Sequence, residues 1–289
     1  MRFDRIAILD WSAARGAKRG KDSIWIGVAD ASGTRCENIA TRPQAAARLT
    51  DLTQEAIAQG TRLLIGADFA FGFPQGFAPA LTGVASALSV WDWLSVHVTD
   101  TAGNVSNYRE VAARINARFS GGGPFWGNGM ATDMPGLPRL KPPLPPGFGA
   151  NRRCDLVARE GGVVPKTVWQ LAGAGAVGAQ VLTGLPVLNT LRRSFGKALC
   201  VWPFHPPETP VVLAEVYPSL LHARVRAQVA KGVIADKAQV DLLATALFRH
   251  GVQGTLGRLM RPDDPAALAE EGWILGAGQS ALLNAGLPP

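Results

Sequence analysis

The chain has 289 residues, of which 47% are hydrophobic, and this is enough apolar material for one large domain or two small ones. Its formal net charge of +7 is a moderate basic excess, which favours a polyanionic partner without identifying one. The three cysteines, Cys36, Cys154 and Cys200, are far apart and form no CxxC pair, so reduced, partly buried thiols are expected.

The N-terminal quarter of the chain alternates short apolar runs with turn residues. Three strands are predicted first, then a helix that begins with Pro43, then a fourth strand. These elements cover residues 5–10, 24–29, 34–40, 43–58 and 62–68. The order β-β-β-α-β favours a mixed sheet flanked by helices.

The rest of the chain is less regular until it returns to a strand and two helices. A Gly- and Pro-rich stretch at 120–150 indicates an ordered loop or lid. Before it, residues 82–97 are mostly apolar, and residues 106–119 are predicted to form a helix. After it, helices are predicted at 151–160 and 179–195. They are followed by a strand at 211–216 and by helices at 219–231 and 237–250.

Three of the apolar runs end in a single carboxylate: Asp10, Asp68 and Glu215. A charge at the end of a buried strand is costly unless a partner compensates it. If the three strands end at one edge of the sheet, their acids converge and need a cation. Carboxylates without nearby soft ligands suit Mg²⁺ or Mn²⁺ rather than zinc, so a divalent metal site is the prediction.

The last predicted helix supplies a fourth acid. Asp241 lies beside the apolar stripe formed by residues such as Val240, Leu243 and Leu247, so it is expected to point inward. Asp236 precedes the helix and has Gln239 three residues later, which is a capping-box pattern, so it is interpreted as a helix cap. Asp241 is therefore preferred as the fourth member of the site.

These segments resemble the ribonuclease H-like superfamily and, more narrowly, the DUF429 family of predicted nucleases. The resemblance rests on residues 8–13, 65–74, 215–219 and 236–244, in that order along the chain. It implies an α/β fold with a mixed five-stranded sheet and a large helical and loop insertion between strands 4 and 5.

The resemblance also implies a division of the chain. The ribonuclease H-like core would comprise residues 1–74 and 205–260, the insertion subdomain residues 75–204, and a C-terminal extension residues 261–289. In such a fold the first and fourth strands place their acids side by side. Asp10 and Asp68 are thereby implied as metal ligands together with Asp241, with Glu215 nearby on the fifth strand.

Basic residues suggest where a phosphate backbone would lie. The loop after the first strand carries Arg15, Lys18, Arg19 and Lys21 beside Asp10, and a second basic edge is expected from Arg152 and Arg153. The run 173–178 matches G-x-G-x-x-G, but no acid follows it within 20 residues. A tight turn before a helix is therefore favoured over a dinucleotide site.

The function that these features favour is a metal-dependent phosphodiester hydrolase that acts on nucleic acid through an acidic two-metal site. Asp10, Asp68, Glu215 and Asp241 are its candidate catalytic residues, and Mg²⁺ or Mn²⁺ its cofactor. Two alternatives remain open: a nucleotide- or phosphate-handling enzyme of the actin-like and sugar-kinase branch, and a non-catalytic binding module. A link of either to cofactor (molybdopterin) biosynthesis also stays open.

The sequence gives weaker indications of location and assembly. The N-terminal apolar run is too short for a signal peptide, so a cytoplasmic protein is expected. The uncharged stretch between Lys166 and Arg192 contains polar residues, glycines and Pro186, and a buried loop and helix is favoured there over a membrane span. A homodimer is compatible with the sequence.

Overall fold

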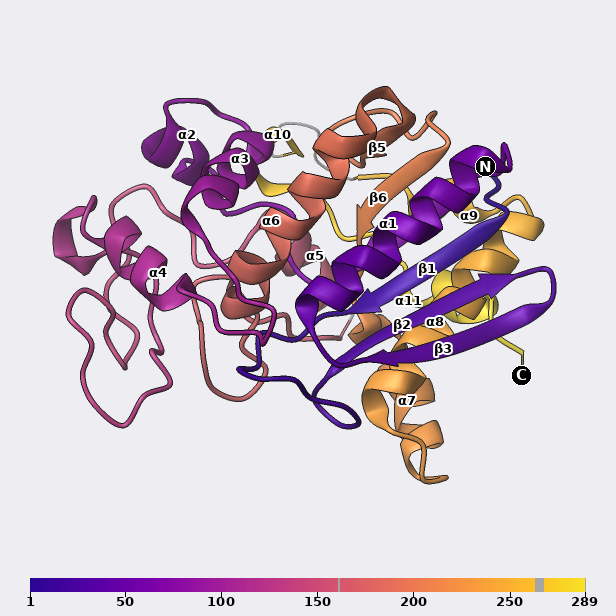
Figure 1. Ribbon diagram of the computed structural model, residues 1–289, viewed down its shortest axis with the longest axis horizontal. Coiled ribbons are helices and arrows are strands. Elements are labelled where there is room, and N and C mark those ends of the chain that lie inside the picture. The colour runs from indigo at the N-terminus through magenta and orange to yellow at the C-terminus, as the bar shows by residue number, and fades with distance from the viewer. Residues whose placement is uncertain (161, 263–267, 289) are drawn as a thin grey trace.

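The strands form one six-stranded mixed sheet, which lies in the right half of the view in Figure 1. The structure is a computed structural model that describes residues 1–160, 162–262 and 268–288. The strand order is β3-β2-β1-β4-β6-β5. The strands are β1 (Arg5–Asp10), β2 (Ile24–Asp30), β3 (Gly33–Ile39), β4 (Leu63–Ala67), β5 (Leu199–Val201) and β6 (Val211–Glu215).

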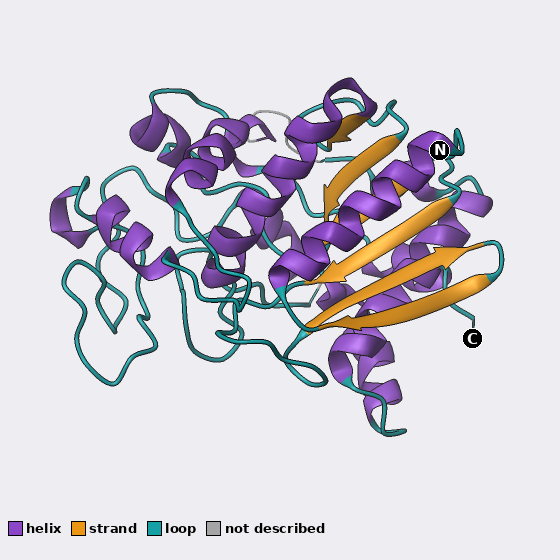
Figure 2. Cartoon of the chain, in the orientation of Figure 1, coloured by secondary structure: helices purple, strands orange, loops and turns teal. Residues whose placement is uncertain are grey.

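Helices flank this sheet, and the segment between β4 and β5 consists of helices joined by long loops (Figure 2). The α-helices in the described ranges are α1 (Arg42–Ala58), α2 (Phe77–Thr82), α3 (Ala87–His97), α4 (Tyr108–Asn116), α5 (Arg153–Glu160), α6 (Gly178–Phe195), α7 (His222–Val229), α8 (Ala235–Val252), α9 (Leu256–Leu259), α10 (Leu268–Glu271) and α11 (Ser280–Ala285). Short 3-10 turns lie at Ser120–Gly122, Gly196–Ala198 and Pro218–Leu221.

The direction of the strands decides which residues meet at one edge of the sheet. β1, β4 and β6 are parallel neighbours, whereas β2 is antiparallel to both β1 and β3. The carboxyl ends of β1, β4 and β6 therefore lie at the same edge, next to the start of β2. Asp10, Asp68 and Glu215 all lie at or directly after these ends, as the sequence predicts.

Successive strand residues face opposite sides of the sheet, and each side has its own hydrophobic core. Ala7 and Leu9 belong to the core on the side of α1, α3 and α6. Ile6 and Ile8 belong to the core on the side of α8 and α11. Gly27 lets α8 approach β2 closely, because a Cβ there would lie 2.7 Å from the backbone oxygen of Val240.

The predicted α/β class and the mixed sheet flanked by helices are confirmed, but the predicted number of strands is wrong. The sheet has six strands rather than five, because the short β5 pairs in parallel with β6. Three residues are too few to show a periodic pattern in the sequence.

The segment 75–204 packs closely against the sheet. Trp91, Phe125 and Leu185 from this segment are buried in the same hydrophobic cluster as Leu9 and Leu213 of the sheet. The division into a core, an insertion and an extension remains a prediction.

Among the described residues, no helix has both the length and the apolar character needed to span a bilayer. The uncharged stretch before Arg192 instead forms a loop and most of α6, whose side chains are largely buried.

Candidate active site

Four aspartates line one small cavity at the edge where β1 and β4 end. The cavity has a volume of about 250 Å³. Its lining residues are Asp10, Trp11, Ser12, Asp22, Ser23, Asp68, Gln180, Asp236 and Gln239. The lining itself contains no lysine, arginine or histidine, although Nζ of Lys18 lies 3.7 Å from Oδ2 of Asp22. The cavity is referred to below as the acid pocket.

Asp10 and Asp68 are adjacent because the ladder between β1 and β4 continues to their positions. Leu9 is paired with Ala67, and the amide of Asp68 donates to the backbone oxygen of Leu9 at 3.1 Å. Side chains alternate between the two faces of the sheet, so Asp10 lies on the same face as Ile8, which is the face that α8 covers. Asp68 lies on this face as well, because it follows Ala67 in the neighbouring strand as Asp10 follows Leu9. The sequence prediction that these two acids lie together is supported by this register.

Burial and mutual repulsion make ionisation of this pair unfavourable. Asp10 is only 7% exposed, and its pKa is raised well above the ordinary value, first by burial and then by the charges of Asp68 and Asp236. Burial raises the pKa of Asp68 to about 7, although the amide of Trp11 donates to its Oδ1 at 2.8 Å and favours the charged form. The two carboxyl groups also share a hydrogen bond. Without a cation, the pair therefore retains a proton near neutral pH.

The first turn of α8 brings Asp236 into the acid pocket. The N-cap of this helix is Ile234, and Asp236 lies within the first turn, where its Oδ2 accepts a hydrogen bond from the amide of Asp22 at 2.6 Å. Its charge raises the pKa of both Asp10 and Asp68. The sequence interpretation made Asp236 a helix cap, whereas the structure places it in the lining of the acid pocket.

Asp241 does not line the acid pocket, contrary to the prediction. It lies five residues further along α8, which at about 1.5 Å per residue is about 7.5 Å from Asp236 along the axis. Its charge acts on Cys36 of β3, whose pKa is raised to about 11 mainly by burial. Asp241 is partly buried and lies near the outer strand β3 rather than beside Asp10.

Glu215 is held by its own arginine. Nη1 and Nη2 of Arg152 donate to Oε2 and Oε1 of Glu215, each at 2.6 Å, and Arg152 also pairs with Asp155 at 2.8 Å. All three side chains are buried. Glu215 is paired with Ala67 rather than Asp68, so it faces the opposite side of the sheet from Asp10 and Asp68. The amide of Phe71 completes its set of partners.

Two predictions therefore need correction. Glu215 does not join the acid pocket but lines a separate cavity of about 50 Å³ that also touches Asp68 and Lys166. Arg152 is not an exposed phosphate contact, because its guanidinium is buried in the ion pairs. Arg153 is exposed, and the contact it makes from its backbone is with Glu271, at 2.5 Å from the amide to Oε2.

The basic loop after β1 is exposed, but its members have different surroundings. Lys18 lies 3.7 Å from a carboxylate oxygen of Asp22, and Arg19 donates to the backbone oxygen of Asn38. Lys21 is exposed. Arg15 is also exposed and lines a different cavity, one that adjoins the acid pocket. Of the four phosphate contacts predicted in this loop, Arg15 is the one that lines a cavity next to the acid pocket.

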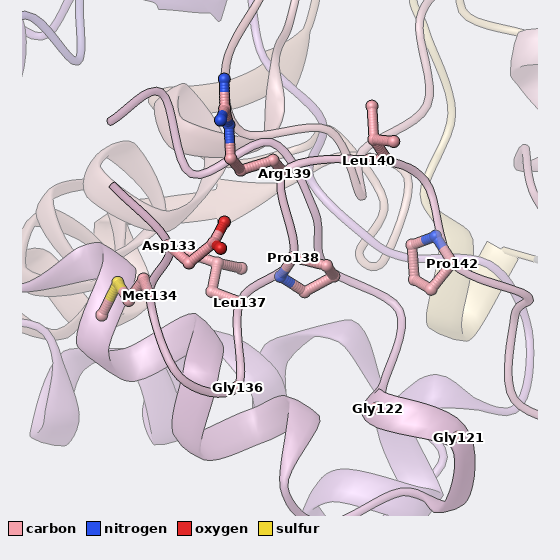
Figure 3. A pocket seen from close by; sticks show the side chains of 10 residues that line it. All are labelled: Gly121, Gly122, Asp133, Met134, Gly136, Leu137, Pro138, Arg139, Leu140 and Pro142. Atoms are coloured by element: carbon pink, nitrogen blue, oxygen red, sulfur yellow. The ribbon is translucent and has the colours of Figure 1, made fainter. Parts of the chain in front are cut away.

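A larger cavity lies apart from the aspartates, in the Gly- and Pro-rich segment after α4. It measures about 940 Å³. Figure 3 shows its lining, in which Asp133 and Arg139 are the charged side chains among mostly apolar groups such as Leu137 and Pro138. It contains none of the predicted site residues, so its size alone does not make it the functional site.

The chain matches no family model, and comparisons with curated proteins and with solved structures also gave no match. The interpretation of the site therefore depends on its geometry. Within the described ranges, no group of three or more His, Cys, Asp or Glu side chains is positioned to hold a metal ion. The donors that are close together are the carboxylates of Asp10 and Asp68.

The chemistry of these donors fits a magnesium-like ion better than zinc. Zinc requires three or four protein ligands, often histidine or cysteine. Mg²⁺ retains several waters and is held by one or two carboxylates plus substrate phosphates. Asp10 and Asp68, two adjacent carboxylates in a lining without a basic side chain, meet the second requirement.

Proposed function

We propose that this protein is a metal-dependent phosphodiester hydrolase with a ribonuclease H-like core, and that its substrate is nucleic acid. The observation that carries the proposal is the pair formed by the buried Asp10 and the partly buried Asp68 on adjacent parallel strands, in a pocket lined by four aspartates and by no basic residue. The antiparallel β1-β2-β3 unit followed by parallel β4 and β6 supports the proposed core.

Asp10 and Asp68 would hold Mg²⁺ or Mn²⁺ in this proposal. A bound ion of this kind polarises the phosphate and lowers the pKa of a water molecule, which supplies the nucleophile. The protein itself holds the two carboxylates close together and partly shields them from solvent. The amide of Trp11 fixes one oxygen of Asp68, and the backbone ladder fixes its main chain.

Asp236 has a different role from the pair. Its Oδ2 is engaged by the amide of Asp22, and its pKa is raised, mainly by burial. We assign it to orienting water at the acid pocket. Glu215 is assigned to structure: with Arg152 it anchors the amide of Phe71, three residues after Asp68, and thereby holds the segment that follows β4.

The test is cleavage of labelled single-stranded DNA and RNA in the presence of Mg²⁺ or Mn²⁺. The wild-type protein is compared with Asp10→Asn, which preserves the shape of the side chain, and with Asp241→Asn as the matched control on α8. The proposal predicts that EDTA and Asp10→Asn abolish cleavage, whereas Asp241→Asn retains it.

Two results would contradict the proposal. Cleavage that survives in Asp10→Asn at the wild-type rate would point to a contaminant or another site. Absence of cleavage in the wild type, combined with binding of oligonucleotides, would favour a non-catalytic binding module.

A further inference from the structure

A second polar cavity of about 710 Å³ adjoins the acid pocket. Gln180, in the first turns of α6, lines both spaces. The chain after β1 also passes from one to the other: Trp11 and Ser12 line the acid pocket, and the next residues up to Arg15 line the second cavity. Any substrate bound at the aspartates therefore has this cavity as a direct neighbour.

The wall between the two spaces is firmly held. Arg42 is buried, pairs with Asp100, and donates through Nη1 to the backbone oxygens of Ser12 at 3.1 Å and of Ala14 at 3.0 Å. From the other side, Nε2 of Gln180 donates to the backbone oxygen of Trp11 at 2.7 Å. The 11–14 segment is thus held by hydrogen bonds on two sides.

The second cavity has an excess of positive charge. Arg15 is exposed, and within the described residues it forms no ion pair or side-chain hydrogen bond. Arg109 lies over the ring of Tyr108 at 4.7 Å, and its Nε donates to the backbone oxygen of Asn128 at 2.7 Å. Among the residues that the structure describes, Nη1 and Nη2 of Arg109 have no hydrogen-bond partner. Glu110 is the acid in the lining.

The start of α6 adds to this charge distribution. Ala176 and Ala179, on either side of the first residue of the helix, line the cavity. The first turn contains no acidic residue, so the partial positive charge of the helix N-terminus is not offset there. Arg42, the third arginine of the lining, is paired with Asp100. The other two arginines and the helix N-terminus, against one glutamate, favour an anionic ligand.

We propose that this cavity binds a backbone phosphate, together with its nucleotide, of a single-stranded nucleic acid whose neighbouring phosphate lies at Asp10 and Asp68. Arg15 and Arg109 are the residues that contact the phosphate. The volume is within the range of pockets that enclose small-molecule-sized groups, which suits one nucleotide and not a duplex. This inference rests on the proposed function, because it takes the acid pocket as the place of cleavage.

The experiment separates binding from cleavage. Binding of a fluorescein-labelled oligothymidylate is measured by anisotropy in EDTA at several salt concentrations. The variants are Arg15→Gln, Arg109→Gln and, as a matched control, Arg249→Gln, which replaces an exposed arginine of α8 outside both cavities. Arg15→Lys tests whether charge alone restores binding.

The inference predicts that Arg15→Gln and Arg109→Gln each weaken binding by about tenfold. Each should also reduce the slope of log affinity against log salt by about 0.7, the value for one lost phosphate contact on a single strand. Arg249→Gln should leave both quantities unchanged, and Arg15→Lys should restore most of the slope. Because the side chain of Arg15 has no described polar partner to lose, Arg15→Gln is expected to fold normally.

The inference is overturned if Arg15→Gln and Arg109→Gln bind the oligonucleotide as the wild type does, or if a duplex binds as tightly as the single strand. If the wild type cleaves and Arg15→Gln cleaves with unchanged KM, the cavity assignment fails while the proposed function stands. If the arginine variants lose binding but no metal supports cleavage, the hydrolase proposal fails while the cavity assignment stands.

Discussion

Replacement of Asp68 by asparagine should stabilise the protein at neutral and mildly alkaline pH in the absence of metal. Asparagine has nearly the same shape, and its oxygen can still accept the hydrogen bond from the amide of Trp11. What it removes is a partly buried negative charge close to Asp10 and Asp236. A gain in folding stability on removal of this charge is expected if the negative charges of the site are uncompensated in the absence of a cation.

The magnitude follows from the pKa of Asp68, which burial raises from 3.8 to about 7. The difference is about three pH units, and each unit corresponds to about 1.4 kcal/mol, so the upper limit is about 4 kcal/mol. Because the side chain is partly exposed, water reduces this effect, and we expect a gain of about 1–3 kcal/mol.

The sign of the pH dependence is also fixed. The folded protein keeps a proton on Asp68 that the unfolded chain has already lost between about pH 4 and 7, so wild-type stability falls as the pH rises through this window. The free energy of unfolding of both proteins, measured by urea denaturation in EDTA, should therefore diverge from about pH 4 upward and differ fully by about pH 8.

Comparison of the two proteins cancels the titration of groups elsewhere in the chain. The reasoning is refuted if Asp68→Asn is equally or less stable than the wild type at about pH 8, or if the difference is the same at about pH 4.

Three further predictions concern the surroundings of the site. Arg152→Met should destabilise the fold by about 3–5 kcal/mol, because it leaves Glu215 and Asp155 buried without a counter-charge. The control Arg153→Met replaces an exposed side chain and should change the free energy of unfolding by less than about 0.5 kcal/mol. Equal urea midpoints for the two variants would disprove this. Gly27→Ala should destabilise the fold by about 1–3 kcal/mol, because the new Cβ would lie 2.7 Å from the backbone of Val240 in α8. Gly251→Ala, within α8 itself, has its nearest neighbour at 3.8 Å and should be neutral or stabilising, and thermal unfolding of the two variants checks the difference. In a calorimetric titration, Asp236→Asn should weaken Mn²⁺ binding by about tenfold or more, and Asp241→Asn should weaken it by less than about twofold. The reverse order would support Asp241 as the metal ligand, as the sequence predicts.

The sequence predicted most of the fold because its signals are local. The apolar runs ending at Asp10 and Asp68 and the amphipathic helices identified the elements, and the strand–helix order indicated a mixed sheet. The short β5 could not be predicted, because three apolar residues carry no period.

The site was predicted less completely than the fold, because it depends on register and on partners far away in the chain. Glu215 ends an apolar run as Asp10 does, but a one-residue difference in pairing turns it to the other face, where Arg152 neutralises it. The local pattern at Asp236 also matched a helix cap. Its position in the acid pocket becomes visible only once the start of α8 is placed at the same sheet edge.

The most direct test of the central claim is a Mn²⁺ titration of the wild-type protein and Asp10→Asn, followed by electron paramagnetic resonance of the free ion. The account predicts that the wild type binds Mn²⁺ in the submillimolar range and that Asp10→Asn binds it at least about tenfold more weakly. No binding by the wild type at millimolar Mn²⁺, or equal binding by the two proteins, would contradict it.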